Sequence, residues 1–320
     1  MSHDLTIEDV ISRTGLEKSR LQYLEARFPF YINRRLFDPE GRFYSREHIK
    51  TFLHLDHVVS ANCDLAETIE NKNQKKGSLL VFASGKGGVG KTTLSVNLSL
   101  LAAQSGKKVV FIDGDLGMAN AHVLLGMQPK QDMGHLISNG VPLDQIISTT
   151  HFNMKFIAGG GGIYELANLD SPRLDLLNDA INSLRLNADW VTIDSPAGIG
   201  KTVLSWIGAS DELVVVTAPT PLAILDAYGL IKVAVQKGYH GRIHIIINSV
   251  ISHSQGRDLF DQLSGCCWRF LKRDLIFLGA IRRDLFIERM LMARTPFVCS
   301  NEKNNTHRHL AEIAEKLFAG

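Results

Sequence analysis

The feature that most constrains the fold of this chain is a glycine-rich run at residues 84–93, Ser-Gly-Lys-Gly-Gly-Val-Gly-Lys-Thr-Thr. An apolar stretch at 79–83 precedes the run, and a stretch with helical character follows it. A loop of this composition between a buried strand and a helix N-terminus binds phosphate, because its glycines let backbone N–H groups surround phosphate oxygens. The run therefore predicts a strand, a phosphate-binding loop and a helix, in that order.

The side chains of the loop have distinct expected roles. Lys91 can reach the β- and γ-phosphates of a nucleotide, and the Thr92 hydroxyl can bind Mg²⁺. The residues expected to bind the nucleotide through this loop are Gly87, Gly88, Val89, Gly90, Lys91, Thr92 and Thr93.

The rest of the chain alternates short apolar runs with longer amphipathic segments. Two runs, Val-Val-Phe-Ile-Asp and Leu-Val-Val-Val-Thr, are continuously apolar, which is typical of parallel strands covered by helices on both faces. We predict strands at 79–83, 108–112, 155–157, 190–193, 212–217, 242–247 and 275–278, and helices near 91–104, 171–186, 221–237, 255–272, 284–293 and 306–318. This order indicates an α/β fold, a doubly wound and mostly parallel sheet with its ligand at the carboxyl ends of the strands.

The polar segment at 71–77 shows no periodicity and is predicted to be a linker. It separates a small domain at 1–70 from a nucleotide-binding domain at 78–320. The chain has a net charge of +2, which gives no overall attraction to nucleic acid or membrane. Its four cysteines include no Cys-x-x-Cys pair, so we expect a reduced, cytoplasmic protein that does not carry an iron–sulfur cluster.

Polar residues follow three of the predicted strands. Asp113 and Asp115 come after the strand at 108–112, Asp194 comes after 190–193, and Asn248 comes after 242–247. The carboxyl ends of parallel strands meet at one edge of a sheet, so these side chains should lie near the phosphate loop. Two carboxylates there can organise Mg²⁺ and orient a water molecule, and an amide can contact the adenine base. A single Asp at a strand end would more often cap the next helix.

Residues 86–92 resemble the deviant Walker A motif of the MinD/ParA ATPases, and residues 194–198, Asp-Ser-Pro-Ala-Gly, resemble their second switch. The resemblance covers roughly residues 78–318. Stretches at 113–126, 163–169 and 223–232 are similar to the FlhG branch, also called FleN, whose members control flagellar number and placement.

The resemblance implies an ATP-dependent homodimer. Lys86 would be the signature lysine that crosses to the nucleotide of the partner subunit, although from sequence alone it could equally be a solvated loop lysine. By the same resemblance Asp115 would activate water, and Asp113 and Asp194 would hold Mg²⁺ together with Thr92. Lys86, Lys91 and Asp115 would then be the catalytic residues, and Asn248 would contact the base.

Residues 5–60 indicate a helix-turn-helix with a wing at 38–44. Thr6 and Asp9 have the spacing of a capping box. The order of elements resembles the winged helix of MerR-type regulators, but Gln22 stands where those regulators usually carry an arginine. Residues 13–50 hold nine Lys or Arg against five Asp or Glu, a modest excess for DNA binding. DNA binding and docking of a partner protein both remain open.

Two further segments have simpler interpretations. The glycine run at 159–162 lacks a following Lys-Ser or Lys-Thr pair, so we expect a flexible loop and not a second phosphate site. The amphipathic stretch at 307–318 has few basic residues, so we expect a helix packed on the core and not a membrane anchor.

The leading hypothesis is a slow, Mg²⁺-dependent ATPase that acts as a dimerisation switch in flagellar number or placement, with a regulatory protein partner. One alternative is a ParA-type partition ATPase with an autoregulatory DNA-binding domain. A second is a transcription regulator that senses ATP without significant turnover.

Overall fold

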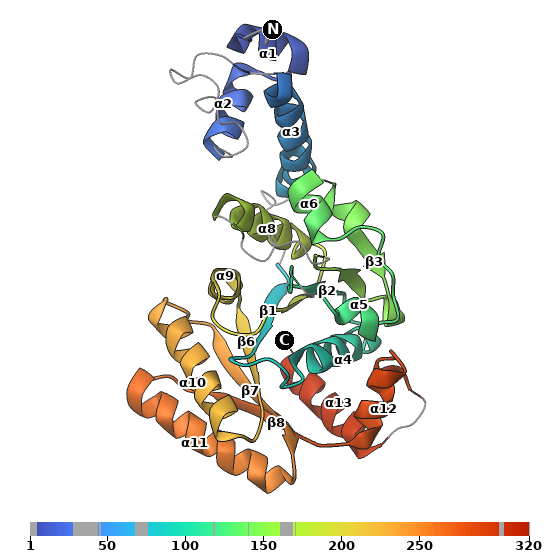
Figure 1. Cartoon of the computed structure of the whole chain (residues 1–320), viewed down its shortest axis with the longest axis vertical. Coiled ribbons are helices and arrows are strands. Elements are labelled where there is room, and N and C mark those ends of the chain that lie inside the picture. The colour runs from blue at the N-terminus through green and yellow to red at the C-terminus, as the bar shows by residue number, and fades with distance from the viewer. Residues whose placement is uncertain are drawn as a thin grey trace.

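The computed structural model describes residues 5–27, 44, 46–67, 76–117, 119–139, 141–160, 169, 171–300 and 304–319. An eight-stranded sheet forms its centre, in the order β3-β4-β2-β5-β1-β6-β7-β8 (Figure 1). The strands are β1 Ser78–Ala83, β2 Val109–Asp113, β3 Ile147–Thr149, β4 Lys155–Ile157, β5 Trp190–Asp194, β6 Glu212–Thr217, β7 Arg242–Val250 and β8 Ile276–Arg282. All neighbouring pairs are parallel except β3 with β4, which confirms the predicted mostly parallel sheet.

Helices cover both faces of the sheet, as the continuously apolar strands predict. One face packs against α6 Met133–Asn139, α8 Ser171–Leu184, α9 Lys201–Ala209, α10 Pro221–Gln236 and α11 His253–Leu271. The other packs against α4 Lys91–Gln104, α5 Ala121–Leu124, α12 Leu285–Met292 and α13 Asn305–Leu317. Three short 3₁₀ helices, η3 Leu143–Ile146, η4 His151–Asn153 and η5 Phe297–Cys299, complete the described elements of this domain.

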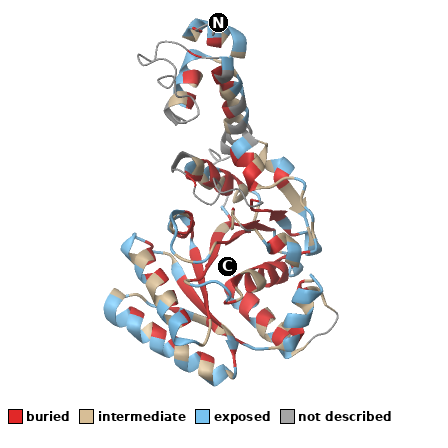
Figure 2. Ribbon diagram, in the orientation of Figure 1, coloured by how far each residue is buried: buried red, intermediate tan, exposed pale blue. Residues whose placement is uncertain are grey.

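Successive residues of β1 enter two separate cores because side chains alternate across a strand. Leu79 and Val81 join the core under α8 to α11, whereas Leu80 and Phe82 join the core under α4 and α13. Figure 2 shows these strands as a buried layer between partly exposed helices. Because β1 is buried on both faces, it holds the phosphate loop in a fixed position at the carboxyl edge of the sheet.

The structure confirms most predicted elements and corrects some boundaries. β7 continues to Val250, so Asn248 lies inside this strand and not after it. Gly159 and Gly160 lie outside regular secondary structure, as predicted for a loop, but both are buried, and 161–162 lie outside the described residues. The core-packing prediction for the last helix is confirmed, because its apolar face is buried at Leu310, Ile313, Ala314 and Leu317.

The N-terminal unit contains α1 Ile7–Thr14, α2 Lys18–Arg27 and α3 Arg46–Glu67. The predicted capping box is present, with Thr6 N donating to Asp9 Oδ2 at 2.9 Å. Gly15 has φ 73° and ends α1 in a left-handed conformation. The wing predicted at 38–44 lies outside the described residues except for Tyr44, which pairs with Leu5.

One hydrophobic cluster joins the N-terminal unit to the sheet domain. It is formed by Leu5, Val10, Leu21, Leu24, Tyr44, Phe52 and Leu55, together with Leu176 of α8. The linker predicted at 71–77 is described only at its last two residues, and there the chain already belongs to the sheet domain. Gly77 is buried, and its N–H donates to the Arg185 carbonyl at 2.8 Å. Among the described helices, none has the length and apolar character needed to cross a membrane.

A buried ion pair lies at the amino ends of β6 and β7, opposite the phosphate loop. Glu212 Oε2 is 2.5 Å from His244 Nε2, and Arg242 contacts the other carboxylate oxygen. Burial acts to raise the pKa of Glu212, but the hydrogen bonds and charges of His244 and Arg242 outweigh it and lower this pKa below 4.5. The ionised carboxylate is thus favoured in the folded state.

Replacing Glu212 with Gln should destabilise the protein by about 2 kcal/mol at pH 7, because the isosteric amide cannot accept both charged bonds. The contribution of the carboxylate is present above its unfolded pKa of about 4.5 and is lost as the pH falls through its lower folded pKa. Chemical denaturation of both proteins should therefore show a difference that shrinks as the pH drops below 4.5. An equal difference at all pH values would contradict this assignment.

Candidate functional site

The glycine-rich loop connects the carboxyl end of β1 to the first residue of α4. Gly90 has φ 85°, and a side chain there would place Cβ 2.3 Å from Asn248 Nδ2, so only glycine fits. Gly88 also has a positive φ, 79°. Positions 87 and 88 would find open space around an added Cβ. The backbone N–H groups of a loop of this kind can surround phosphate oxygens.

The carboxylate of Asp194, at the end of β5, collects hydrogen bonds from the first turns of α4. Lys91 Nζ donates to its Oδ1 at 2.8 Å and Thr92 Oγ1 donates to its Oδ2 at 2.6 Å. Ser95 Oγ also donates to Oδ1, at 3.0 Å. Lys91 is only 9% exposed, so its charge is balanced by Asp194 in a site with little access to water.

Asp113 ends β2 and lies in register with Asp194. It is 1% exposed, and its two oxygens accept from Asp115 N at 3.2 Å and Ala121 N at 2.9 Å. Burial raises the pKa of Asp113 to about 7, and the charge of Asp194 adds to this effect. The two backbone donors and Lys91 offset it only in part.

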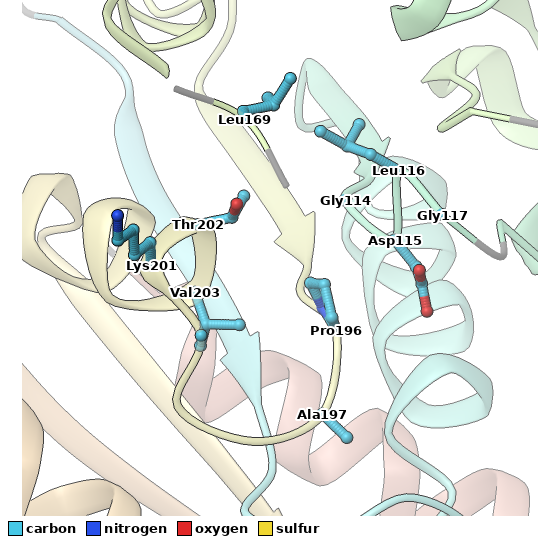
Figure 3. A pocket seen from close by; sticks show the side chains of 11 residues that line it. Gly114, Asp115, Leu116, Gly117, Leu169, Pro196, Ala197, Lys201, Thr202 and Val203 are labelled. Carbon is cyan, nitrogen blue, oxygen red and sulfur yellow. The ribbon is translucent and has the colours of Figure 1, made fainter. Parts of the chain in front are cut away.

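Asp115 lies on the segment between β2 and α5, and is half-buried. It lines a cavity of about 370 Å³ between this segment and the loop that follows β5. Figure 3 shows the cavity with Asp115 on one side and Pro196 and Ala197 on the other. Apart from Leu169, the lining residues come from the segments after β2 and β5 and from α9, and the residues of the phosphate loop, which the structure describes, do not line this cavity.

Two predicted site residues flank the phosphate loop. Asn248 Nδ2 donates to the Val89 carbonyl at 2.8 Å, so in this state its amide holds the loop. Lys86 is exposed at the tip of the loop, and among the described residues none forms an ion pair with it. The structure thus brings Lys91, Thr92, Asp113 and Asp194 together, with Asp115 and Asn248 at their borders and Lys86 turned toward solvent.

The residues present fit a nucleotide with Mg²⁺. Hydroxyl and carboxylate oxygens are the ligands that Mg²⁺ prefers, and Thr92 and Asp194 already share a hydrogen bond, with Asp113 beside them. Bound Mg²⁺ would neutralise the charge that develops on the phosphates. Among the described residues, no group of three His, Cys, Asp or Glu side chains could hold a metal ion by itself. Mg²⁺ is commonly bound through one or two carboxylates together with substrate phosphates.

A Gly-rich loop between β1 and α4, a buried lysine and a strand-end aspartate define a P-loop nucleoside triphosphatase. The family described as ParA, NUBPL iron-transfer P-loop NTPase, matches residues 75–318. The chain belongs to this family, and it is an ATPase of the MinD/ParA group.

Two curated relatives are named as an antiactivator and as a flagellum site-determining protein. The antiactivator FleN of Pseudomonas aeruginosa is 34% identical over 239 residues, which cover 75% of this chain and 85% of FleN. The flagellum site-determining protein YlxH of Helicobacter pylori is 31% identical, over 70% of this chain and 76% of YlxH. Among solved structures, septum site-determining protein MinD complexed with Mg-ADP from Pyrococcus horikoshii OT3 matches with a TM-score of 0.63 and 25% identity, covering 75% of this chain and 96% of MinD.

Sequence reasoning missed Ser95 as part of the site. Ser95 follows Lys91 by four residues, so both lie on the same face of α4, which is the signal that could have identified it. Its hydroxyl gives Asp194 a third donor and so helps to fix the carboxylate.

Replacing Lys91 with Ala should weaken nucleotide binding at least about 100-fold, a loss of about 2.7 kcal/mol, because it removes the buried cation that faces the phosphates. Calorimetric titration with ADP and an ATP analogue measures this loss. Lys237→Ala, which removes an exposed lysine at the end of α10, far from the phosphate loop, is the matched control and should bind normally. Similar affinities of the Lys91 variant and the control would contradict the assignment.

Proposed function

We propose that this chain is a Mg²⁺-dependent ATPase in which ATP drives assembly of a homodimer and hydrolysis releases it. The observation that carries the proposal is the contrast between the two lysines of the loop. Lys91 is buried and paired with Asp194, whereas Lys86 is exposed and has no ion-pair partner among the described residues. Because Lys86 is not paired within the described part of its own subunit, its charge can stabilise the phosphates of a nucleotide bound by a second subunit.

Exposed apolar side chains around the loop support the same proposal. Ile199, Leu222, Leu225 and Ile251 are between 52% and 78% exposed and follow the carboxyl ends of β5, β6 and β7. α10 lies against the loop here, because an added Cβ on Gly85 would be 2.2 Å from the Asp226 carbonyl oxygen. Apolar groups gathered at the nucleotide edge favour coverage by another protein surface.

The proposed roles of the site residues follow from this assembly. Residues 87–93 bind the phosphates, and Thr92, Asp113 and Asp194 hold Mg²⁺. Asp115 orients the attacking water, and Asn248 contacts the base after releasing Val89. The name of YlxH, a flagellum site-determining protein, supports a role in flagellar placement, and the name of FleN, an antiactivator, supports a regulatory protein partner. A cytoplasmic location and control of flagellar number are part of the same proposal.

Replacing Lys86 with Ala tests the proposal. The variant should bind nucleotide within about threefold of the wild type, since Lys86 faces solvent in its own subunit. It should fail to dimerise with a slowly hydrolysed ATP analogue, and its kcat should fall at least about 100-fold. Multi-angle light scattering with ADP and with the analogue measures the mass. A Lys86 variant that still doubles its mass with the analogue would contradict the crossing role, and a wild type of constant mass would contradict the switch.

DNA binding by the N-terminal unit is a second candidate function. It is favoured by the helix pair α1 and α2, joined by a tight turn at Gly15, with Lys18, Gln22 and Tyr23 exposed on α2. Arg20 does not add to this surface, since its Nε is 2.6 Å from Asp56 Oδ1.

If this unit binds DNA, full-length Lys18→Ala should bind a duplex several-fold more weakly and lower the dependence of log affinity on log salt by about one. Lys201→Ala serves as the control on the sheet domain. Fluorescence anisotropy at several salt concentrations measures both quantities. No binding of the wild type at low salt would instead favour a role in docking a protein.

A further inference from the structure

The chain that follows β4 lies beside the chain that follows β2 at the carboxyl edge of the sheet. The two strands are parallel, with Ile112 opposite Ile157, so Gly159 is placed next to the segment that carries Asp113 and Asp115. The Ala158 carbonyl accepts a hydrogen bond from Met133 N at 2.9 Å, which fixes the chain at this point.

A side chain at position 159 has no space. An added Cβ would lie 2.7 Å from the Asp115 carbonyl oxygen, 2.8 Å from the Asp113 carbonyl oxygen and 2.9 Å from Ala119 Cβ. Two of these three atoms belong to the backbone, so no rotation of a flexible side chain can relieve the overlap. Either the backbone at 113–115 or the chain at 158–160 would have to move.

The opposite side of this segment is equally closed. Gly114 N donates to the Asp194 carbonyl at 2.8 Å, and an added Cβ on Gly114 would be 2.5 Å from the Trp206 ring. Trp206 is fully buried on α9. The segment therefore lies between Gly159 on one side and Trp206 with β5 on the other, and Asp115 projects from it beside the cavity in Figure 3.

We infer that Gly159 is a positioning residue for Asp115, because its missing side chain allows the backbone at 113–115 to hold the Asp115 carboxylate where it orients water. The inference rests on the proposed role of Asp115 in hydrolysis. Displacement of a reacting group by about 1 Å can cost about 100-fold in rate, so an overlap of this size acts on the chemical step. The three atoms nearest to the added Cβ belong to residues 113, 115 and 119, and none of them belongs to the phosphate loop.

Gly159→Ala should lower kcat about 10- to 100-fold while leaving the KM for ATP and the affinity for ADP within about threefold. The matched control is Gly265→Ala on α11, where an added Cβ meets no atom within 4 Å. This control should keep wild-type kcat. The kcat of Asp115→Asn is measured in parallel, so that a failure of the proposed role of Asp115 can be distinguished from a failure of the inferred role of Gly159.

Ala119→Gly provides a second variant that cannot create an overlap. It removes the methyl group that faces Gly159, and should lower kcat about threefold or more with unchanged ADP affinity. It decides the case if Gly159→Ala does not fold, as thermal unfolding will show. If Asp115→Asn is inactive and Gly159→Ala keeps wild-type kcat, the inference is overturned. If Gly159→Ala is unfolded, wild-type kcat in Ala119→Gly overturns it in the same way. Retained activity of Asp115→Asn overturns the proposed role of Asp115 and the inference with it.

Discussion

The carboxylate of Asp194 is the interaction on which the site depends. It receives Lys91, Thr92 and Ser95 from a single helix, and it comes from a strand buried on both faces. A buried lysine is costly unless its charge is paired, so the same bond that stabilises the unliganded loop also places the cation for phosphate. Binding of a nucleotide and Mg²⁺ can exchange these bonds without moving the sheet.

The position of the site follows from the topology. From β1 the chain crosses to β2, β3 and β4 on one side and returns to β5 beside β1. It then crosses from β5 to β6, β7 and β8 on the other side, so the crossovers that leave β1 and β5 run in opposite directions. Ligands of open α/β sheets bind at this divergence, outside the carboxyl ends of the strands. Asp113, Asp194 and the phosphate loop meet there because their strands β2, β5 and β1 are adjacent.

The sequence predicts this fold well where a motif of known chemistry or a clear apolar run is present. The loop at 84–93 identifies its strand and helix, and the long apolar runs identify seven strands in nearly correct positions. The sequence does not predict the strand Ile147–Thr149, because its residues Ile-Ser-Thr include a single apolar side chain and form no apolar run. Gly159 was interpreted as part of a flexible loop, since a glycine that is needed for close packing has the same appearance in a sequence as one in an open turn. The three-dimensional structure is needed to show that Asp113, Asp115 and Ala119 lie around Gly159.

The two units of the chain share part of their hydrophobic cores. Leu176 of α8 completes the cluster of the N-terminal helices, and a buried leucine contributes about 1.5–3 kcal/mol. Dividing the chain between the units would expose this leucine on one fragment and leave a gap in the other. α8 also reaches the helix that follows Asp194, through Asn178 Nδ2 and Ser205 Oγ at 3.1 Å. The helix α8 therefore touches both the N-terminal helices and α9, the helix that begins after the strand end at Asp194.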